Sequence, residues 1–115
     1  MRNRLAFFAA AVLLAAFPSV LPAHHSFVQE FDISKPIKLK GVITKVEWTN
    51  PHSWLYVDGK DENGREAKWA FEGSAPSLLI RRGISRSMLK VGDMITIEGF
   101  RARDGSSVAS STFVI

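Results

Sequence analysis

Alternating apolar and polar residues run through most of residues 37–115, and this pattern constrains the fold more than any other feature of the chain. A period of two residues is typical of β-strands that pack one face on a core and expose the other. A short helix is predicted after the third strand, because Pro76 suits a first helical turn and Gly83 suits a helix end. The strands are predicted over residues 37–48, 53–58, 66–72, 94–100 and 107–115.

This order of three strands, one helix and two strands matches the OB-fold, a small five-stranded Greek-key barrel. The alternation of the first strand changes phase at Gly41, which predicts a bulge or a sharp bend at that glycine. A bent strand can serve two parts of a closed sheet. The alternative architecture is an open antiparallel sheet with one helix on its face. We therefore expect an all-β barrel with one short helix.

The first 23 residues have the composition of a cleavable export signal. Arg2 and Arg4 precede an apolar run over residues 5–17, and the segment ends at the small residue Ala23. The apolar run is too short to span a bilayer, and a small residue suits the cleavage site. The expected organisation is a signal peptide over residues 1–23, an amino-terminal arm over 24–36 and an OB-like domain over 37–115.

The composition restricts how such a domain is held together and what it binds. The chain has no cysteine, which excludes disulfides and thiolate metal sites, so packing alone must stabilise the domain. Arg2 and Arg4 belong to the expected leader, so the net charge falls from +4 for the whole chain to +2 for residues 24–115. That balance does not favour nucleic acid as a partner. We expect a bacterial periplasmic or secreted protein without a membrane span after signal removal.

Three histidines are the candidate metal ligands. Cleavage after Ala23 makes His24 the first residue, and its free amine and imidazole can chelate one metal ion. A second imidazole, from His25 or His52, would complete a three-nitrogen histidine brace. Nitrogen donors of this kind favour Cu(II), with zinc and nickel as less favoured alternatives. The sequence therefore predicts a copper site formed by His24, His25 and His52.

His52 lies in the turn between the first two strands, a loop that often belongs to the binding surface of OB-folds. Glu30 and Asp32 could complete a zinc-like site or orient an imidazole. The alternative is that the histidines are only solvated terminal and turn residues. Met88 and Met94 fall in segments whose pattern predicts burial, so they do not indicate a thioether site for Cu(I).

A second hypothesis rests on aromatic residues of the first three predicted strands. Their rings could stack on a sugar, a peptide or a planar cofactor. The competing explanation is that a domain without disulfides needs large apolar side chains in its core. No pattern typical of a catalytic triad, a phosphate loop or a carboxylate pair is present, so nothing indicates an enzyme. The four rings are those of Trp48, Trp54, Tyr56 and Trp69.

Several short motifs extend over nearly all of residues 23–99. They are A-H-H-S-F at 23–27, E-F-D at 30–32, V-E-W-T-N-P-H at 46–52, W-A-F-E at 69–72, L-I-R-R-G at 79–83, V-G-D at 91–93 and I-E-G at 97–99. In this combination the chain resembles a set of small exported bacterial proteins of unknown function. The resemblance implies a periplasmic or secreted domain and brings no activity with it.

Together these features predict a periplasmic or secreted protein that binds a divalent transition metal, with copper favoured, for storage, delivery or sensing. A periplasmic partner protein would exchange the metal with it. The alternative is a non-metal ligand- or protein-binding module that uses the aromatic barrel face.

Overall fold

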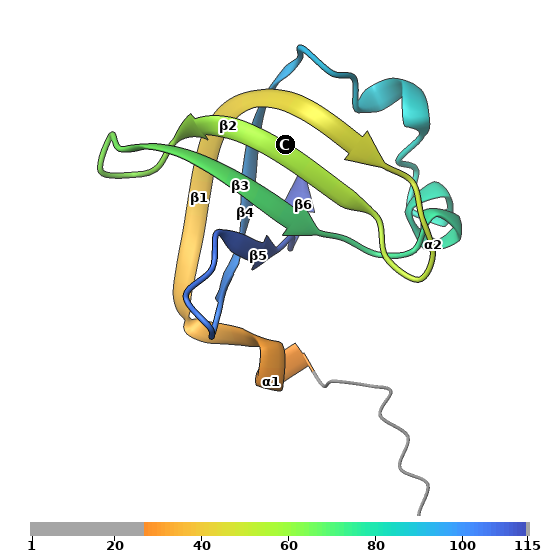
Figure 1. Cartoon of the computed structure of the whole chain (residues 1–115). Helices are drawn as coiled ribbons and strands as arrows, with labels where there is room; N and C mark the ends of the chain where they lie inside the picture. Colours follow the sequence, from red (N-terminus) through yellow and green to blue (C-terminus); the bar gives the residue numbers. More distant parts are fainter. Residues whose placement is uncertain (1–26, 115) are drawn as a thin grey trace, which may run out of the picture.

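A computed structural model describes residues 27–114 as a strongly bent sheet with two short α-helices at its margins (Figure 1). Nine elements follow one another along the chain. They are α1 (Phe27–Glu30), β1 (Phe31–Glu47), β2 (Trp54–Lys60), β3 (Glu66–Glu72), α2 (Pro76–Arg81), the 3₁₀-helix η1 (Arg86–Met88), β4 (Met94–Ala102), β5 (Val108–Ser110) and β6 (Phe113–Val114).

The sheet closes on itself, because β1 pairs with strands on both of its edges. The 17-residue β1 pairs antiparallel with β2 and, from Phe31 to Val42, antiparallel with β4. β2 continues to β3, β3 pairs in parallel with β5, and β5 pairs with β4. The ring is therefore β1-β2-β3-β5-β4, with β6 added beside β4. The prediction of an OB-like five-stranded barrel with a short helix after the third strand is confirmed.

The core fills the inside of this ring. Alternate residues of each strand point inward, as a strand with a period of two requires. Trp69, Val46 and Leu89 pack against the margin of this core. The buried cluster draws on all five barrel strands, so the core exists only where the ring is closed. The buried side chains are those of Ile37, Leu39, Ile43, Leu55, Val57, Phe71, Ile95, Ile97 and Ala109.

The bulge that the alternation predicted at Gly41 lies further along β1. The register between β1 and β2 shifts between Ile43 and Lys45, two residues further on. Gly41 instead permits a close approach of two strands, since a Cβ there would lie 2.2 Å from the carbonyl oxygen of Asp58. β1 also begins at Phe31 rather than at Ile37. Phe31 is only 4% exposed and pairs with Ala102 of β4, which extends the strand beyond the predicted boundary.

Two further predictions are corrected. The last predicted strand, residues 107–115, is divided into β5 and β6, because the backbone of Ser111 bonds to Glu72 and that of Thr112 to Glu98. The side chains of Met88 and Met94, expected in the core, are 60% and 61% exposed. In the segment of the chain that the structure describes, no helix has the length and apolar character needed to cross a membrane.

The close approach of β5 to Gly99 of β4 predicts a strong effect on stability. A Cβ at Gly99 would lie 1.4 Å from the carbonyl oxygen of Ser110, so Gly99→Ala must move β4 away from β5. We expect the free energy of unfolding to fall by about 2 kcal/mol or more and Tm by about 10 °C. Thermal unfolding followed by circular dichroism measures both.

The control is Gly64→Ala in the β2–β3 hairpin. A Cβ at Gly64 meets nothing within 4 Å, so only its positive φ of 79° opposes the substitution. Its expected cost is about 1 kcal/mol. Equal stability losses in the two variants would contradict a steric role for Gly99.

Candidate functional site

His52 lies in a tightly ordered turn between β1 and β2. The turn contains a cis peptide bond between Asn50 and Pro51, just before the histidine. The hydroxyl of Thr49 donates a hydrogen bond of 2.8 Å to the carbonyl oxygen of His52. Proline fixes one backbone dihedral and the threonine closes the turn, which together restrict the position of His52.

A set of hydrogen bonds joins this turn to the end of β3. The backbone N–H and the hydroxyl of Ser53 both donate to the carbonyl oxygen of Ser74, at 3.1 and 2.7 Å. The N–H of Gly73 donates back to the carbonyl oxygen of Ser53 at 2.8 Å. A Cβ at Gly73 would lie 2.8 Å from the Ser53 hydroxyl, so the glycine allows Ser53 to lie this close to the end of β3. The two segments therefore hold His52 beside Glu72 and Gly73.

The imidazole of His52 is oriented by its Nδ1 atom. Nδ1 lies 3.2 Å from the carbonyl oxygen of Gly73 and 3.4 Å from a carboxylate oxygen of Glu72. A carbonyl oxygen only accepts hydrogen bonds, so Nδ1 carries the proton in this contact. With the proton on Nδ1, the lone pair of the uncharged ring form lies on Nε2. With half of the side chain exposed, this arrangement leaves Nε2 as a nitrogen donor for a ligand.

Glu72 is the buried acid of the site. Its side chain is only 16% exposed. Burial is the main cause that raises the pKa of its carboxyl group; the neighbouring His52 lowers that pKa and the charge of Glu30 raises it. A carboxylate in such a setting is stabilised by any cation that approaches it. Sequence reasoning did not single out Glu72, although it ends the W-A-F-E motif just where β3 ends.

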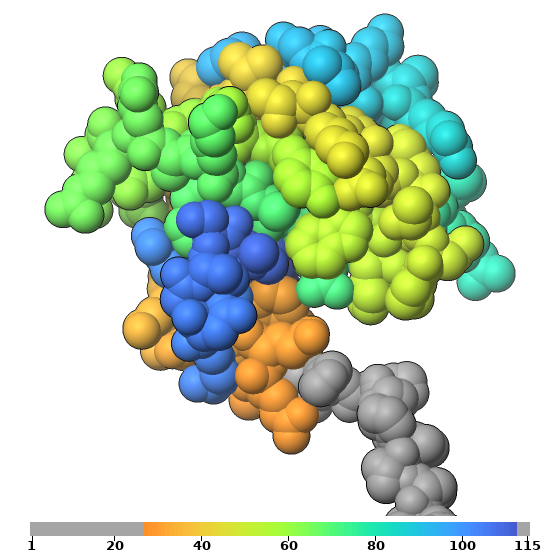
Figure 2. All heavy atoms as spheres, viewed as in Figure 1, coloured from red at the N-terminus to blue at the C-terminus, as the bar shows by residue number. Residues whose placement is uncertain are grey.

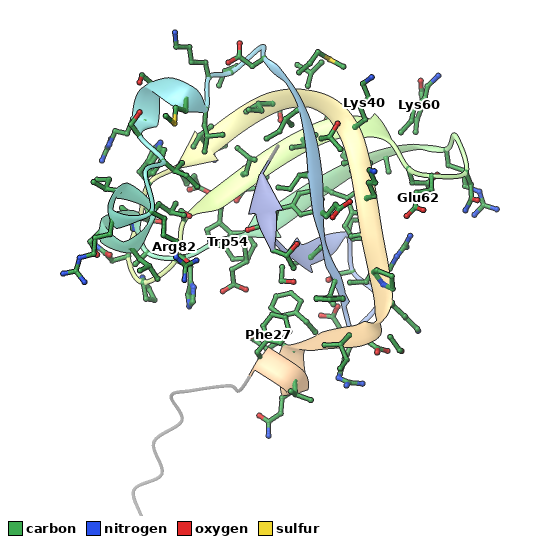
Figure 3. The ribbon with its side chains drawn as sticks, turned by 180° about the vertical axis from the view of Figure 1, so that it is seen from behind. Phe27, Lys40, Trp54, Lys60, Glu62 and Arg82 are labelled. Atoms are coloured by element: carbon green, nitrogen blue, oxygen red, sulfur yellow. The ribbon has the colours of Figure 1, made fainter. Side chains whose placement is uncertain are left out.

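These residues surround a cavity of about 280 Å³. In the space-filling view a hollow separates the orange surface around α1 from the yellow-green surface of the β1–β2 turn (Figure 2). Figure 3 shows the Phe27 side chain rising from α1 toward the strands. The ring of Phe27 lies 5.2 Å from that of Phe31, which ties the start of the described chain to the barrel. The lining residues are Phe27, Glu30, Phe31, His52, Glu72, Gly73, Ser74, Ser110 and Ser111.

The predicted metal ligands are only in part covered by the structure. His52 and Glu30 line the same cavity, whereas His24 and His25 lie outside the described residues. Asp32 is not among the lining residues; it accepts hydrogen bonds from Ser34, which lower the pKa of its carboxyl group, and lies 3.9 Å from Arg103. Within residues 27–114, no three His, Cys, Asp or Glu side chains lie close enough together to hold a metal ion.

The four aromatic residues are divided between the two faces of the sheet. Trp69 pairs across the strands with the buried Val57 and lies 6.5 Å from the ring of Phe71, so it faces the core. Trp54 and Tyr56 alternate with buried residues of β2 and point the other way. The guanidinium of Arg86 lies over Trp48, with its central carbon 5.6 Å from the centre of the Trp48 ring. Their role as stacking surfaces stays a prediction.

Trp54 lines a second cavity, of about 550 Å³, that adjoins the first. Glu30, Phe31 and Glu72 line both cavities. The two carboxylates therefore stand where the cavities meet, with His52 on one side and Trp54 on the other.

The fold and this site define a small OB-like barrel with two adjoining candidate cavities beside α1 and the end of β3. Residues 11–111 match DUF6152, described as a family of unknown function, and the chain belongs to that family. The searches of curated proteins and of solved structures found no match to this chain. The resemblance to a family without an assigned activity is thus confirmed at the level of the family.

The connection between His52 and β3 predicts a specific loss of stability. Ser53 is 7% exposed, and Ser53→Ala removes its hydroxyl hydrogen bond while the backbone bond to Ser74 remains. We expect the free energy of unfolding to fall by about 1 kcal/mol. Urea unfolding monitored by tryptophan fluorescence measures it, with the exposed Ser87→Ala as control. A loss no larger than that of Ser87→Ala would mean that the hydroxyl does not hold the turn.

Proposed function

We propose that this protein binds a divalent transition metal, with copper favoured, through His52 and the amino-terminal residues His24 and His25. Its role is storage, delivery or sensing in the periplasm or outside a bacterial cell, with a partner protein that exchanges the metal. The observation that carries the proposal is the contact of His52 Nδ1 with the Gly73 carbonyl. A metal-binding imidazole commonly donates its other N–H to a carbonyl or carboxylate in this way.

The position of Phe27 supports the participation of the preceding histidines. His25 precedes Phe27 by two residues, so the two Cα atoms are at most about 7.6 Å apart. Phe27 and His52 line the same cavity. The chain between these histidines and Phe27 is therefore short enough for the His25 imidazole and the His24 amine to approach the cavity that His52 lines.

The charge of the cavity also supports a cationic ligand. Glu30 and Glu72 line it together with His52, and none of its nine lining residues is Lys or Arg. Carboxylates that contact the nitrogen ligands, rather than the metal, offset the charge of a divalent ion without coordinating it. The donor set would then be nitrogen atoms alone, for which Cu(II) has the highest affinity among the first-row divalent ions.

Calorimetric titration with Cu(II) tests the proposal on protein whose first residue is His24. We expect His52→Ala to weaken binding at least about 100-fold, since it removes one ligand. One additional residue ahead of His24 should weaken binding comparably, because it displaces the free amine from the His24 chelate.

Glu62→Gln, on the exposed hairpin between β2 and β3, is the control and should leave the affinity unchanged. Equal Cu(II) affinity in the extended and the natural chain would exclude the brace. Unchanged affinity in His52→Ala would exclude the barrel from the site.

The second candidate function is a non-metal ligand-binding module, and the specific observation in its favour is Trp54. Its cavity of about 550 Å³ has the size of small-ligand pockets in proteins. Tryptophan fluorescence separates the two functions. If the protein binds metal, Cu(II) should quench the tryptophan fluorescence and chelator should restore it. If it is a non-metal module, glycans or peptides should change the fluorescence even with chelator present. Trp54→Ala should abolish the second response, and its persistence would exclude Trp54 as the stacking residue.

A further inference from the structure

The connection between β3 and β4 carries the excess positive charge of the barrel domain. Residues 74–92, here called the crossover segment, contain four basic side chains and no acidic one. The other residues between 24 and 115 contain nine basic and eleven acidic side chains, so they carry −2 while the crossover segment carries +4. Its four cations are exposed, and none of them forms an ion pair with another residue between 27 and 114. They are Arg81, Arg82, Arg86 and Lys90.

The same segment exposes apolar side chains beside these cations. Leu79, Ile84 and Leu89 point inward and line a pocket at the end of the barrel. The outward side chains are not part of that packing, and Ile80 is 59% exposed and Val91 66%. Single exposed apolar residues are normal on protein surfaces, but four of the nine large ones in the described part of the chain fall in the crossover segment. They are Leu78, Ile80, Met88 and Val91.

The crossover segment forms one flank of the molecule. In both ribbon views α2 and η1 lie on the same side of the barrel, opposite the hairpin between β2 and β3 (Figures 1 and 3). Figure 3 shows Arg82 on that flank and Lys60 and Glu62 on the opposite side. The dipole of α2 favours the cations at its end, Arg81 and Arg82. It accounts neither for Lys90 nor for the exposed apolar side chains.

We propose that this flank binds the surface of an anionic phospholipid bilayer. The cations lie at the phosphates of the lipid headgroups, and Ile80, Met88 and Val91 enter the boundary between headgroups and acyl chains. Basic side chains interspersed with aliphatic ones are typical of segments that lie on such a surface. A nucleic acid fits less well, because single strands stack on aromatic rings and the crossover segment has none. Only Ser74 of this segment lines the cavity beside His52, so the proposal does not depend on the metal site.

Co-sedimentation with lipid vesicles tests the proposal. The protein used is residues 24–115, which contain the whole closed barrel and lack the apolar run of residues 5–17 that would itself enter lipid. We expect binding to vesicles made of equal amounts of phosphatidylglycerol and phosphatidylcholine, and little binding to phosphatidylcholine alone. Added salt should weaken the binding, because it screens exposed charges. Chelator is present throughout, so the result and the copper titration are independent of each other.

Two variants separate the charges from the apolar side chains. Arg81→Gln, Arg82→Gln and Lys90→Gln together should lower the partition coefficient about 100-fold, since each cation near an anionic surface contributes a factor of about five. Ile80→Ser with Val91→Ser should lower it about 10-fold, because less apolar surface enters the lipid. All five positions are exposed, so circular dichroism should show an unchanged fold for both variants.

The matched control is Lys35→Gln, Lys60→Gln and Arg65→Gln together, which removes the same charge from exposed positions outside the crossover segment. It should lower the partition coefficient by no more than about fivefold, because these charges stay farther from the lipid. An equal loss in this control, or an unchanged partition coefficient in the variant with Ile80→Ser and Val91→Ser, would overturn the proposal. Binding to soluble polyphosphate without binding to vesicles would overturn it as well.

Discussion

The close passage of β5 across β4 is the contact on which the rest of the structure depends. Gly99 has no Cβ, and the Ser110 carbonyl occupies the space that a Cβ would take. This passage brings the next residue, Ser111, to the end of β3, where its N–H and hydroxyl both bond to the Glu72 carbonyl oxygen, at 2.9 and 3.1 Å. Barrel closure and the position of Glu72 are therefore set by the same few atoms. The candidate site is a consequence of how the ring closes.

The site joins three segments that are distant in sequence. The β1–β2 turn supplies His52, the end of β3 supplies Glu72 and Gly73, and α1 supplies Glu30. α1 is itself tied to the barrel, since the Arg103 side chain donates a 2.6 Å hydrogen bond to the Val28 carbonyl oxygen. Each segment carries a polar group that alone would be a solvated surface residue. Their combination lowers the exposure of Glu72 and orients the imidazole of His52.

The sequence predicted the strand order and the place of His52 because both follow from local patterns: alternation, a proline turn and a helix-starting proline. The sequence-based prediction failed for features that depend on which strands pair with one another. Gly41 looks like a bend by its phase, but the close contact with Asp58 is visible only once β1 and β2 are aligned. Met94 is apolar, yet the inward positions of β4 fall to Ile95 and Ile97, which leaves Met94 on the outer face. Isolated exposed apolar residues are normal on protein surfaces, so hydrophobicity alone does not assign a face.

Glu72 was missed for the same reason. In the sequence Glu72 is the last polar residue of an alternating strand pattern. It is enclosed only in the folded barrel, where Ser111 and His52 lie against it. Enclosure changes its chemistry, because a desolvated carboxylate lacks the water that would stabilise its charge. The cavity sets this enclosed carboxylate beside the exposed Glu30 and the imidazole of His52, a lining that suits a cationic ligand.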